Sequence, residues 1–492
     1  MDISQYQDNR TLSSIWQLLI ASAAGVLLGV ISSYLPPLWV ILLVVAFAIL
    51  LVVIRRPEIA VLGVLIFLTT LLPDRYIPVV NVGPGRLYIT EPIIIGLFIY
   101  IFVRWLVKHQ PLVSTPLDIP ILCFYGWALI TTIVGVFVNK NVSIGLAIPE
   151  FRLLSYYLVF FVITNLLTKN EQVKLLLDGL FLLGTIVAIA MIVQFVMGTS
   201  FEFISGRVES LYTAGRRYAD VTRITDTVGE GLITIAFIVK SVFILTSEWK
   251  WKRILHVIQW LLLGIAVGMT YNRTHWAVSF LAILLTLILG SGKDRYRVFK
   301  WVIIGSLTIP IILFLVIGNP NSEAAKFINS TIDRFTTILQ PESYTSEYTS
   351  TLQWREFEYK YGLPQVANHP ILGLGLGARY RPYVYGIDYE AFDGRAYTHN
   401  AHLWIAMKTG LVGYLFFIIF SIAFLWRGFK YWRSIVNPDM RSIYLGFTLA
   451  YLGVLIGSIT HPIAMTLYWT PIIGLMLGIN EVILRLNKKV NL

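Results

Sequence analysis

Residues 401–426 read AHLWIAMKTGLVGYLFFIIFSIAFLW, an apolar run long enough to cross a bilayer as one helix. The lipid interior offers no hydrogen-bonding partners, so a spanning segment must satisfy its backbone internally. The four residues before this run, Tyr397-Thr398-His399-Asn400, are polar, and His402 follows within it, so that two of only seven histidines lie three residues apart. The stretch predicts a membrane helix with titratable side chains at its entrance.

The whole chain has the composition of a membrane protein. Its 492 residues are 57% hydrophobic and 13% charged, whereas soluble domains carry about 25% charged residues. The single cysteine, Cys123, excludes a disulfide framework and a thiolate metal cluster. The N-terminus does not resemble a cleavable signal, because Asp2 and Asp8 accompany Arg10 and the run that follows is long enough to span. The net charge of +12 does not indicate nucleic acid, because most charges stand at the ends of apolar segments.

The fold class expected is an all-α polytopic membrane protein with about 12–14 transmembrane helices and a long, partly helical periplasmic loop. The same length rule identifies about fourteen candidate spans. They lie at roughly 15–34, 38–54, 59–73, 91–107, 118–138, 151–168, 174–198, 229–246, 253–271, 274–290, 300–318, 401–426, 442–460 and 463–484.

The distribution of basic residues predicts the orientation. With the N-terminus in the cytoplasm, every even-numbered connection is basic, as the positive-inside rule expects. These connections include Arg55-Arg56, Arg104 and Lys108, Lys169 and Lys174, Lys250 to Arg253, Lys293 to Lys300, and Arg427 to Arg441; the tail adds Arg485, Lys488 and Lys489. Both termini are therefore expected in the cytoplasm and the odd connections outside it.

Two of the odd connections are long, which gives the expected domain organisation. Residues 1–318 form transmembrane helices with a periplasmic loop at about 199–228, residues 319–400 form a large periplasmic loop, and residues 401–492 form C-terminal transmembrane helices. Apolar residues at helical spacing in 323–340 predict an amphipathic helix lying on the membrane. The stretch 351–362 predicts a second helix, ended by Gly362 and Pro364.

Arginines on the extracytoplasmic side predict an anion site. Arg216, Arg217 and Arg223 cluster in SGRVESLYTAGRRYADVTR, Arg273 stands in TYNRTHW between two spans, and Arg355 stands in WREFEY. Each could instead pair with a lipid headgroup or a nearby carboxylate. Together they favour phosphate, because guanidinium is always charged and offers phosphate oxygens a planar fork. A charge such as Arg273 between two close helices is costly unless it faces a cavity.

His399 is expected on the same side and is the candidate general base, because its ordinary pKa is near 6.5. The alternative is a capping and interfacial histidine. His402 lies one turn further along, at a spacing that a metal site can use, but the nearby Asp388, Glu390 and Asp393 show no ligand-motif spacing. No metal and no cofactor are therefore expected.

The order of these blocks resembles the O-antigen ligase and polymerase superfamily. The blocks are NRTHW, a long loop with Arg355-x-x-x-Tyr359, then NHPILGLGLG and THNAHLWIAMKTGLVG, and they cover roughly residues 260–415. The glycines of GLGLG are not read as a nucleotide loop, because no strand precedes them. The chain departs from the family at Tyr359, where the family often has tryptophan, and Arg216 and Arg217 match it only loosely.

The resemblance implies a GT-C-like glycosyltransferase of the bacterial inner membrane with its site facing the periplasm. Its donor would be an undecaprenyl-diphosphate-linked glycan, and its acceptor another glycan or lipid A-core. The resemblance places the family's catalytic residues on His399 and Arg273, and substrate contacts on Arg355 and, loosely, on the loop arginines. Because the donor already carries a leaving group, arginines would stabilise its charge without a metal and a histidine base would give inversion. Tyr397, Asn400 and His402 would orient the base or the sugar.

Two other classes stay open. A transporter of polysaccharide or lipid-linked glycan would show charged or broken helices near mid-bilayer, but these residues crowd one face and no internal repeat is found. A scaffolding membrane protein gives no reason for His399 and the arginines to share a side.

Overall fold

The computed structural model describes residues 55–68, 79–82, 85–88, 90–200, 204, 206–213, 216–225, 229–247, 253–293, 295–296, 299–300, 322–336, 351–384 and 394–488, with positions 22, 25 and 29. Contacts divide the chain into two units, Met1–Ala60 and Val61–Leu492, and the contacts discussed below lie in the second. The candidate spans 15–34, 38–54 and 300–318 fall essentially outside the described residues.

The described chain is about 78% helical, which confirms an all-α polytopic membrane protein. Its α-helices are α3 (Pro57–Leu68), α4 (Thr90–Lys108), α5 (Asp118–Ile133), α6 (Ile144–Ser155), α7 (Val159–Leu166), α8 (Asn170–Met197), α9 (Glu230–Thr246), α10 (Ile254–Met269), α11 (Arg273–Leu289), α13 (Glu323–Thr336), α14 (Thr351–Asn368), α15 (Ala401–Tyr431), α16 (Pro438–Gly457) and α17 (Thr470–Asn487). The strands form two antiparallel pairs, β1 (Val79–Val82) with β2 (Gly85–Tyr88) and β3 (Arg207–Thr213) with β4 (Arg216–Thr225).

Within the described residues, six helical segments are long and apolar enough to cross a membrane. Most sequence boundaries agree with the helices to within a few residues. The span expected at 151–168 begins earlier, because Ile144–Leu166 forms one segment through a 3₁₀ turn at Tyr156–Leu158. The span expected at 463–484 begins later, at Thr470, and Ile463–Met465 is a separate 3₁₀ turn. Pro471 explains the late start, because a proline in the first helical turn loses no hydrogen bond.

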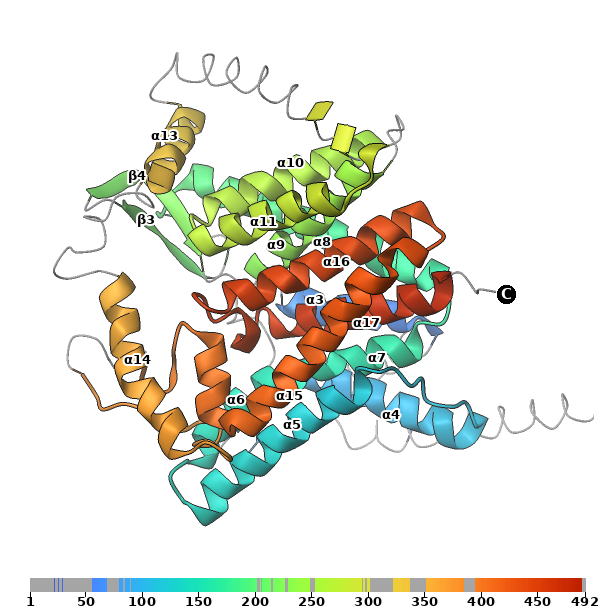
Figure 1. Ribbon diagram of the computed structural model, residues 1–492, viewed down its shortest axis with the longest axis vertical. Coiled ribbons are helices and arrows are strands. Elements are labelled where there is room, and N and C mark those ends of the chain that lie inside the picture. The colour runs from blue at the N-terminus through green and yellow to red at the C-terminus, as the bar shows by residue number, and fades with distance from the viewer. Residues whose placement is uncertain are drawn as a thin grey trace, which may run out of the picture. The chain divides into compact units, whose positions relative to one another are not determined.

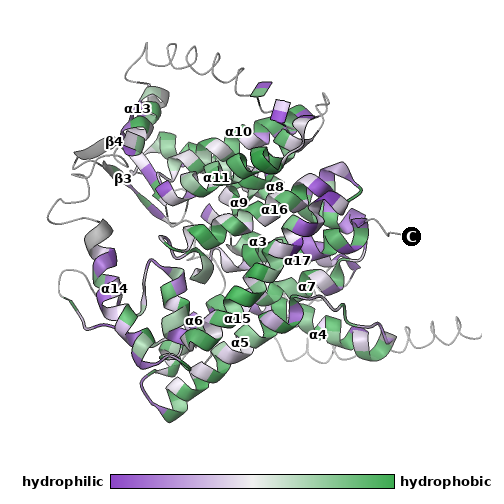
Figure 2. Cartoon of the chain, in the orientation of Figure 1, coloured by the Kyte–Doolittle hydropathy of each residue, from purple (hydrophilic) through white to green (hydrophobic). Residues whose placement is uncertain are grey.

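Helix α15 runs through the centre of the described bundle, beside α5 and α16 (Figure 1). Phe417 and Phe420 of α15 meet Phe124 of α5 with ring centroids 5.7 Å apart in each pair. Elsewhere, small residues let helix backbones approach closely, as where Gly446 of α16 lies against Val239 of α9. The helices are coloured mostly as hydrophobic in Figure 2, and many of their large apolar side chains are exposed, among them Phe102, Leu182 and Phe280, as expected for surfaces in contact with lipid.

One end of the bundle carries polar structure that the sequence left as loop. The connection expected at 199–228 contains the β3–β4 hairpin, which lies against α8, α10 and α13. Helix α13 lies where the amphipathic helix was predicted. Its Phe327 packs on Phe195 and Tyr271 with centroids 5.6 and 6.1 Å apart, while Ile332 and Phe335 are exposed.

Basic residues gather at the opposite ends of the same helices. Arg253, just before α10, pairs with Asp439 of α16 at 2.7 Å, and Arg427 of α15 forms two bonds to Glu481 of α17. Arg485 donates to the carbonyl oxygens of Thr164 and Leu167, which lie at the end of α7. The side chains that set the orientation in the sequence are thus also the ones that join these helix ends.

Helix α14 was predicted to end at Gly362 and Pro364, and this was wrong. It continues to Asn368 with Pro364 inside it. Proline removes one backbone bond from a helix, so other contacts must hold the segment. Gly362 provides such a contact, because its missing side chain leaves room for Leu403 and Met407 of α15.

The GLGLG loop, residues 373–377, packs against a kink in α15. Gly410 has φ +67° and ψ 177°, a backbone conformation that residues other than glycine rarely adopt, and it interrupts the helix. The interruption frees carbonyl oxygens, and two loop N–H groups donate to those of Met407 and Lys408 at 2.8 and 2.9 Å. A Cβ on Gly410 would collide with the carbonyl of Ile371. These glycines therefore serve packing.

Candidate active site

The entrance of α15 is joined to α14 by one carboxylate. Glu358, almost fully buried, accepts hydrogen bonds at Oε2 from the Thr398 hydroxyl at 3.0 Å and from the His399 backbone N–H at 2.9 Å. Its Oε1 lies 2.8 Å from His399 Nδ1. A carboxylate can only accept, so with Glu358 ionised Nδ1 carries a proton and donates it. In the neutral form of the ring Nε2 then keeps its lone pair, and the described residues offer Nε2 no hydrogen-bond partner.

The residues next to His399 in the sequence hold it in position. Asn400 caps α15, because its side-chain oxygen accepts from the Leu403 backbone N–H at 3.0 Å. Its amide nitrogen donates to the Tyr359 hydroxyl at 2.7 Å. Tyr397 lies with its ring edge-on to the His399 imidazole at 5.2 Å between centroids. His399 keeps 32% of its side-chain surface exposed, so it is both held and accessible.

Arg355 and the start of α11, which contains Arg273, both approach the turn after α16. Arg355 Nη2 donates to the Thr460 carbonyl oxygen at 2.8 Å. The Thr460 hydroxyl lies 3.0 Å from that of Thr274, which follows Arg273 at the start of α11. Asn272 caps α11 and accepts from the Thr274 N–H at 3.0 Å. Arg355 and Thr274 therefore contact the same threonine, and Arg273, half-buried, is the neighbour of Thr274 in the first turn of α11.

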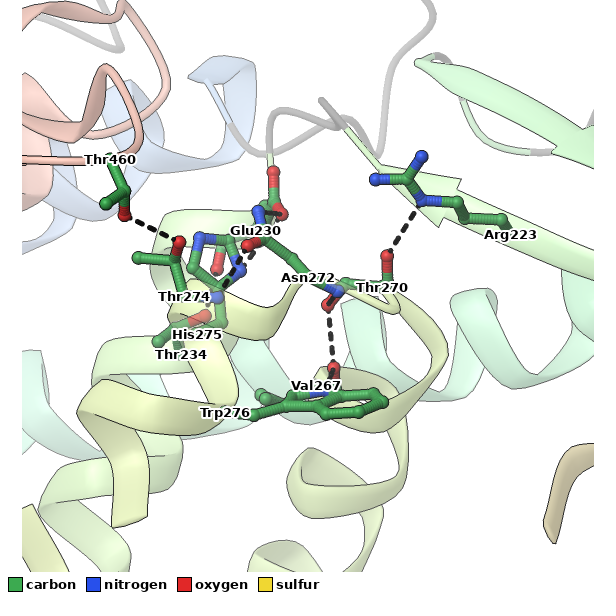
Figure 3. A network of polar contacts seen from close by, with 10 residues as sticks. All are labelled: Arg223, Glu230, Thr234, Val267, Thr270, Asn272, Thr274, His275, Trp276 and Thr460. Carbon is green, nitrogen blue, oxygen red and sulfur yellow. Dashed lines mark hydrogen bonds and ion pairs between the residues drawn. The ribbon is translucent and has the colours of Figure 1, made fainter. Parts of the chain in front are cut away.

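Arg223 lies across the α10–α11 turn from Thr460, as Figure 3 shows. Its Nε donates to the Thr270 carbonyl oxygen at 3.4 Å and its Nη1 to Glu209 Oε1 at 3.2 Å. The network in Figure 3 continues through Asn272 to Glu230, the first residue of α9, with 3.4 Å between Nδ2 and Oε1. Arg223 thus contacts the turn that precedes Arg273.

Arg216 and Arg217 are placed only by their backbone. They open β4 and pair in register with Thr213 and Tyr212 at the hairpin tip, and their side chains lie outside the described part of the structure. The register pairs Arg217 with Tyr212 and Arg223 with Glu209, which are three residues apart on β3, so a bulge in β4 leaves the two arginines about 10 Å apart along the hairpin. Arg216 and Arg217 lie nearer the hairpin tip than Arg223.

His402 makes two contacts inside the bundle. Its Nε2 lies 2.9 Å from the Leu455 carbonyl oxygen of α16, and its Nδ1 lies 3.3 Å from the Tyr414 hydroxyl. Both ring nitrogens are thus engaged with neighbouring side chains and backbone. His402 and His399, although three residues apart, have different surroundings.

Polar residues that the sequence analysis did not single out complete the site. They are Glu358, Thr460 and His461, with Glu230 and His275 beneath them. Burial lowers the pKa of His461 to about 3, the negative charge of Glu230 raises it, and His275, His399 and Arg355 lower it where they carry positive charge. A signal for Glu358 existed, since it stands one turn from Arg355 on the same helix.

The arrangement offers a histidine with a free, solvent-accessible nitrogen, a buried carboxylate that orients it, and guanidinium groups nearby. Such a set can remove a proton from a hydroxyl group and bind an anion beside it. A sequence model of the O-antigen ligase family matches residues 258–418, which include Arg273, Arg355 and His399. No curated protein matches the chain.

Proposed function

Because a model of the O-antigen ligase family matches residues 258–418, we propose that the protein is a membrane glycosyltransferase of the O-antigen ligase and polymerase superfamily. It transfers a glycan from undecaprenyl diphosphate to a sugar hydroxyl, with inversion at the anomeric carbon. The acceptor is either lipid A-core, in a ligase, or another repeat unit, in a polymerase. The family itself implies lipid-linked glycan substrates and a membrane environment.

The observation that carries this proposal is the 2.8 Å contact between His399 Nδ1 and Glu358 Oε1. It leaves Nε2 as the acceptor of a proton from the incoming hydroxyl group. The deprotonated oxygen then attacks the anomeric carbon from the side opposite the diphosphate, the bond to the diphosphate oxygen breaks, and the configuration inverts. Glu358 stabilises the imidazolium that forms, because it holds the charge in a buried position.

Arg273 and Arg355 are the proposed partners of the diphosphate. Negative charge grows on the leaving oxygen as the bond breaks, and fixed guanidinium groups stabilise that charge without reorganising. In this scheme no metal ion is needed at the diphosphate. Arg223, at the turn that precedes Arg273, contributes further positive charge. Arg216 and Arg217, at the hairpin tip, are proposed to contact the glycan or the headgroup region.

The site is proposed to face the periplasm of a bacterial inner membrane. In support, α13, α14 and the hairpin share one end of the described bundle, and the basic residues Arg253, Arg427 and Arg485 gather at the other. The proposal keeps the division into residues 1–318, 319–400 and 401–492, with the middle segment outside the cytoplasm.

Cysteine labelling tests this orientation. In a Cys123→Ala background, a cysteine at the exposed Lys360 should react with an impermeant maleimide added to spheroplasts. A cysteine at the exposed Arg433 should react only after the membrane is permeabilised. The opposite pattern would place the site in the cytoplasm and contradict the proposal.

The activity is tested with purified protein, an undecaprenyl-diphosphate-linked glycan and, in parallel, lipid A-core and repeat-unit acceptors. Transfer to one of the two acceptors, with release of undecaprenyl diphosphate, is the expected result. Binding of the donor without transfer to any acceptor, together with donor movement across a vesicle membrane, would instead support a transporter.

A further inference from the structure

Three metal-binding side chains come together beneath the active site. Glu230 opens α9, His275 lies in the first turns of α11, and His461 follows α16 in the turn that contains Thr460. One donor atom from each residue lies within 4.8 Å of those of the other two. Glu230 and His275 are 2% and 0% exposed, so water does not surround this group.

The protein atoms alone do not satisfy His275. Its Nδ1 lies 3.0 Å from Glu230 Oε1, an ion pair when His275 is protonated. Its Nε2 has no hydrogen-bond partner among the described residues. The neighbours are aromatic, with the rings of His461 and Trp469 both 5.3 Å away between centroids. Leaving a buried polar group unsatisfied typically costs about 1–3 kcal/mol, so this arrangement needs an explanation.

We propose that Glu230, His275 and His461 bind a divalent transition metal ion, and that zinc is the ion they fit best. Two imidazoles and one carboxylate are a donor set that zinc uses, with a fourth position open. Donors about 2.1 Å from a tetrahedral ion lie about 3.4 Å from one another, so the three side chains need to close only slightly. The ion would engage a nitrogen of His275 and balance the buried carboxylate.

The surroundings support the carboxylate as a ligand. Asn272 Nδ2 lies 3.4 Å from Glu230 Oε1, a contact of the kind that orients ligands in metal sites. The three residues come from segments far apart in the sequence, and each segment bears on the active site. His275 follows Arg273 by two residues, and His461 follows Thr460, whose carbonyl oxygen accepts from Arg355. The ion would therefore fix the two arginines relative to each other, at a distance from the reacting diphosphate.

Metal content tests this directly. The full-length protein is purified without a metal-affinity tag, dialysed against dipicolinate, exposed to zinc and desalted, and its zinc is counted by mass spectrometry. About one ion per chain is expected, and X-ray absorption should show nitrogen and oxygen donors at about 2.0–2.1 Å with imidazole scattering. His275→Ala and His461→Ala should reduce zinc to background. His256→Ala is the matched control and should keep it, because His256 lies on α10 and contacts Lys240, ten residues along α9 from Glu230.

Wild-type protein that takes up no zinc would overturn the proposal and would favour a protonated His275 paired with Glu230. Zinc retained by a folded protein lacking both His275 and His461 would overturn it equally. If either alanine variant fails to fold, Glu230→Gln, close to the original side chain in shape, should still lower zinc occupancy. His399→Ala separates this site from the transfer reaction, because it should lose transfer and keep its zinc.

Discussion

Replacing Glu358 with glutamine changes one group that the sequence alone did not identify. The variant keeps the size of the side chain but removes the charge that three donors share, namely the Thr398 hydroxyl and the backbone N–H and Nδ1–H of His399. A hydrogen bond to a charged group is worth about 1.5–3 kcal/mol. If the contact with Nδ1–H acts mainly when the imidazole becomes charged, its loss raises the barrier by that amount. Since about 1.4 kcal/mol is a factor of ten, kcat should fall by about 10- to 150-fold.

The assay is transfer from the lipid-linked donor by purified protein, with kcat and KM measured separately and donor binding checked by titration. The KM for the donor should change little, because Glu358 contacts the base and not the diphosphate in the proposed scheme. Glu356→Gln is the matched control. It lies on the same helix with an exposed side chain and should keep normal kcat. Glu358→Asp should recover part of the activity. A Glu358→Gln protein with unchanged kcat would show that the carboxylate does not act through His399.

Three further substitutions are expected to separate function from structure. His399→Ala should lower transfer by about 10²- to 10⁴-fold with donor binding kept, whereas His402→Ala should mainly lower the free energy of unfolding, by about 1–3 kcal/mol for its two lost bonds; the reverse pattern would show that His402, and not His399, is the base. Arg273→Lys keeps the charge but loses the planar fork, so we expect kcat to fall about 10- to 100-fold with normal expression, from a loss of about 1.5–3 kcal/mol; near-normal transfer would make this residue structural. Gly410→Ala should cost at least about 1–3 kcal/mol in unfolding measurements, and a variant as stable as wild type would show that the kink is dispensable.

Much of the membrane architecture followed from the sequence, because the bilayer imposes one simple length and one secondary structure on each span. Helix α15 begins at Ala401, where the apolar run begins. The errors arose where tertiary contacts override a local rule. Pro364 does not end α14, because Gly362 packs directly on α15. The start of α17 moved to Thr470, because the apolar residues 463–469 are used in a turn that carries part of the site.

Only part of the candidate site could be predicted from the sequence, for a related reason. His399, Arg273 and Arg355 stand out because each is a polar residue at a helix end in an apolar chain. Glu358 and His461 do not, because their meaning depends on which helix ends meet. Arg216, Arg217 and Arg223 looked equivalent in the sequence, yet β4 places the first two at the hairpin tip and the third beyond a bulge, opposite Glu209. Spacing along a strand cannot be read as proximity until the strand itself is recognised.

The kink at Gly410 makes residues 401–409 a short helical segment that is held at both ends. One end carries the Asn400 cap and His399, and the other is tied by the loop at 373–377. Adding one residue to a helix turns what precedes it by about 100° and moves it by about 1.5 Å. A single insertion between His399 and Gly410 would therefore swing the imidazole away from Glu358 or pull the kink off its loop. Beyond Gly413 an insertion has no such effect on the histidine. The length of this segment therefore sets the position of His399 relative to Glu358. A change in that length should abolish activity even when every side chain of the site is retained.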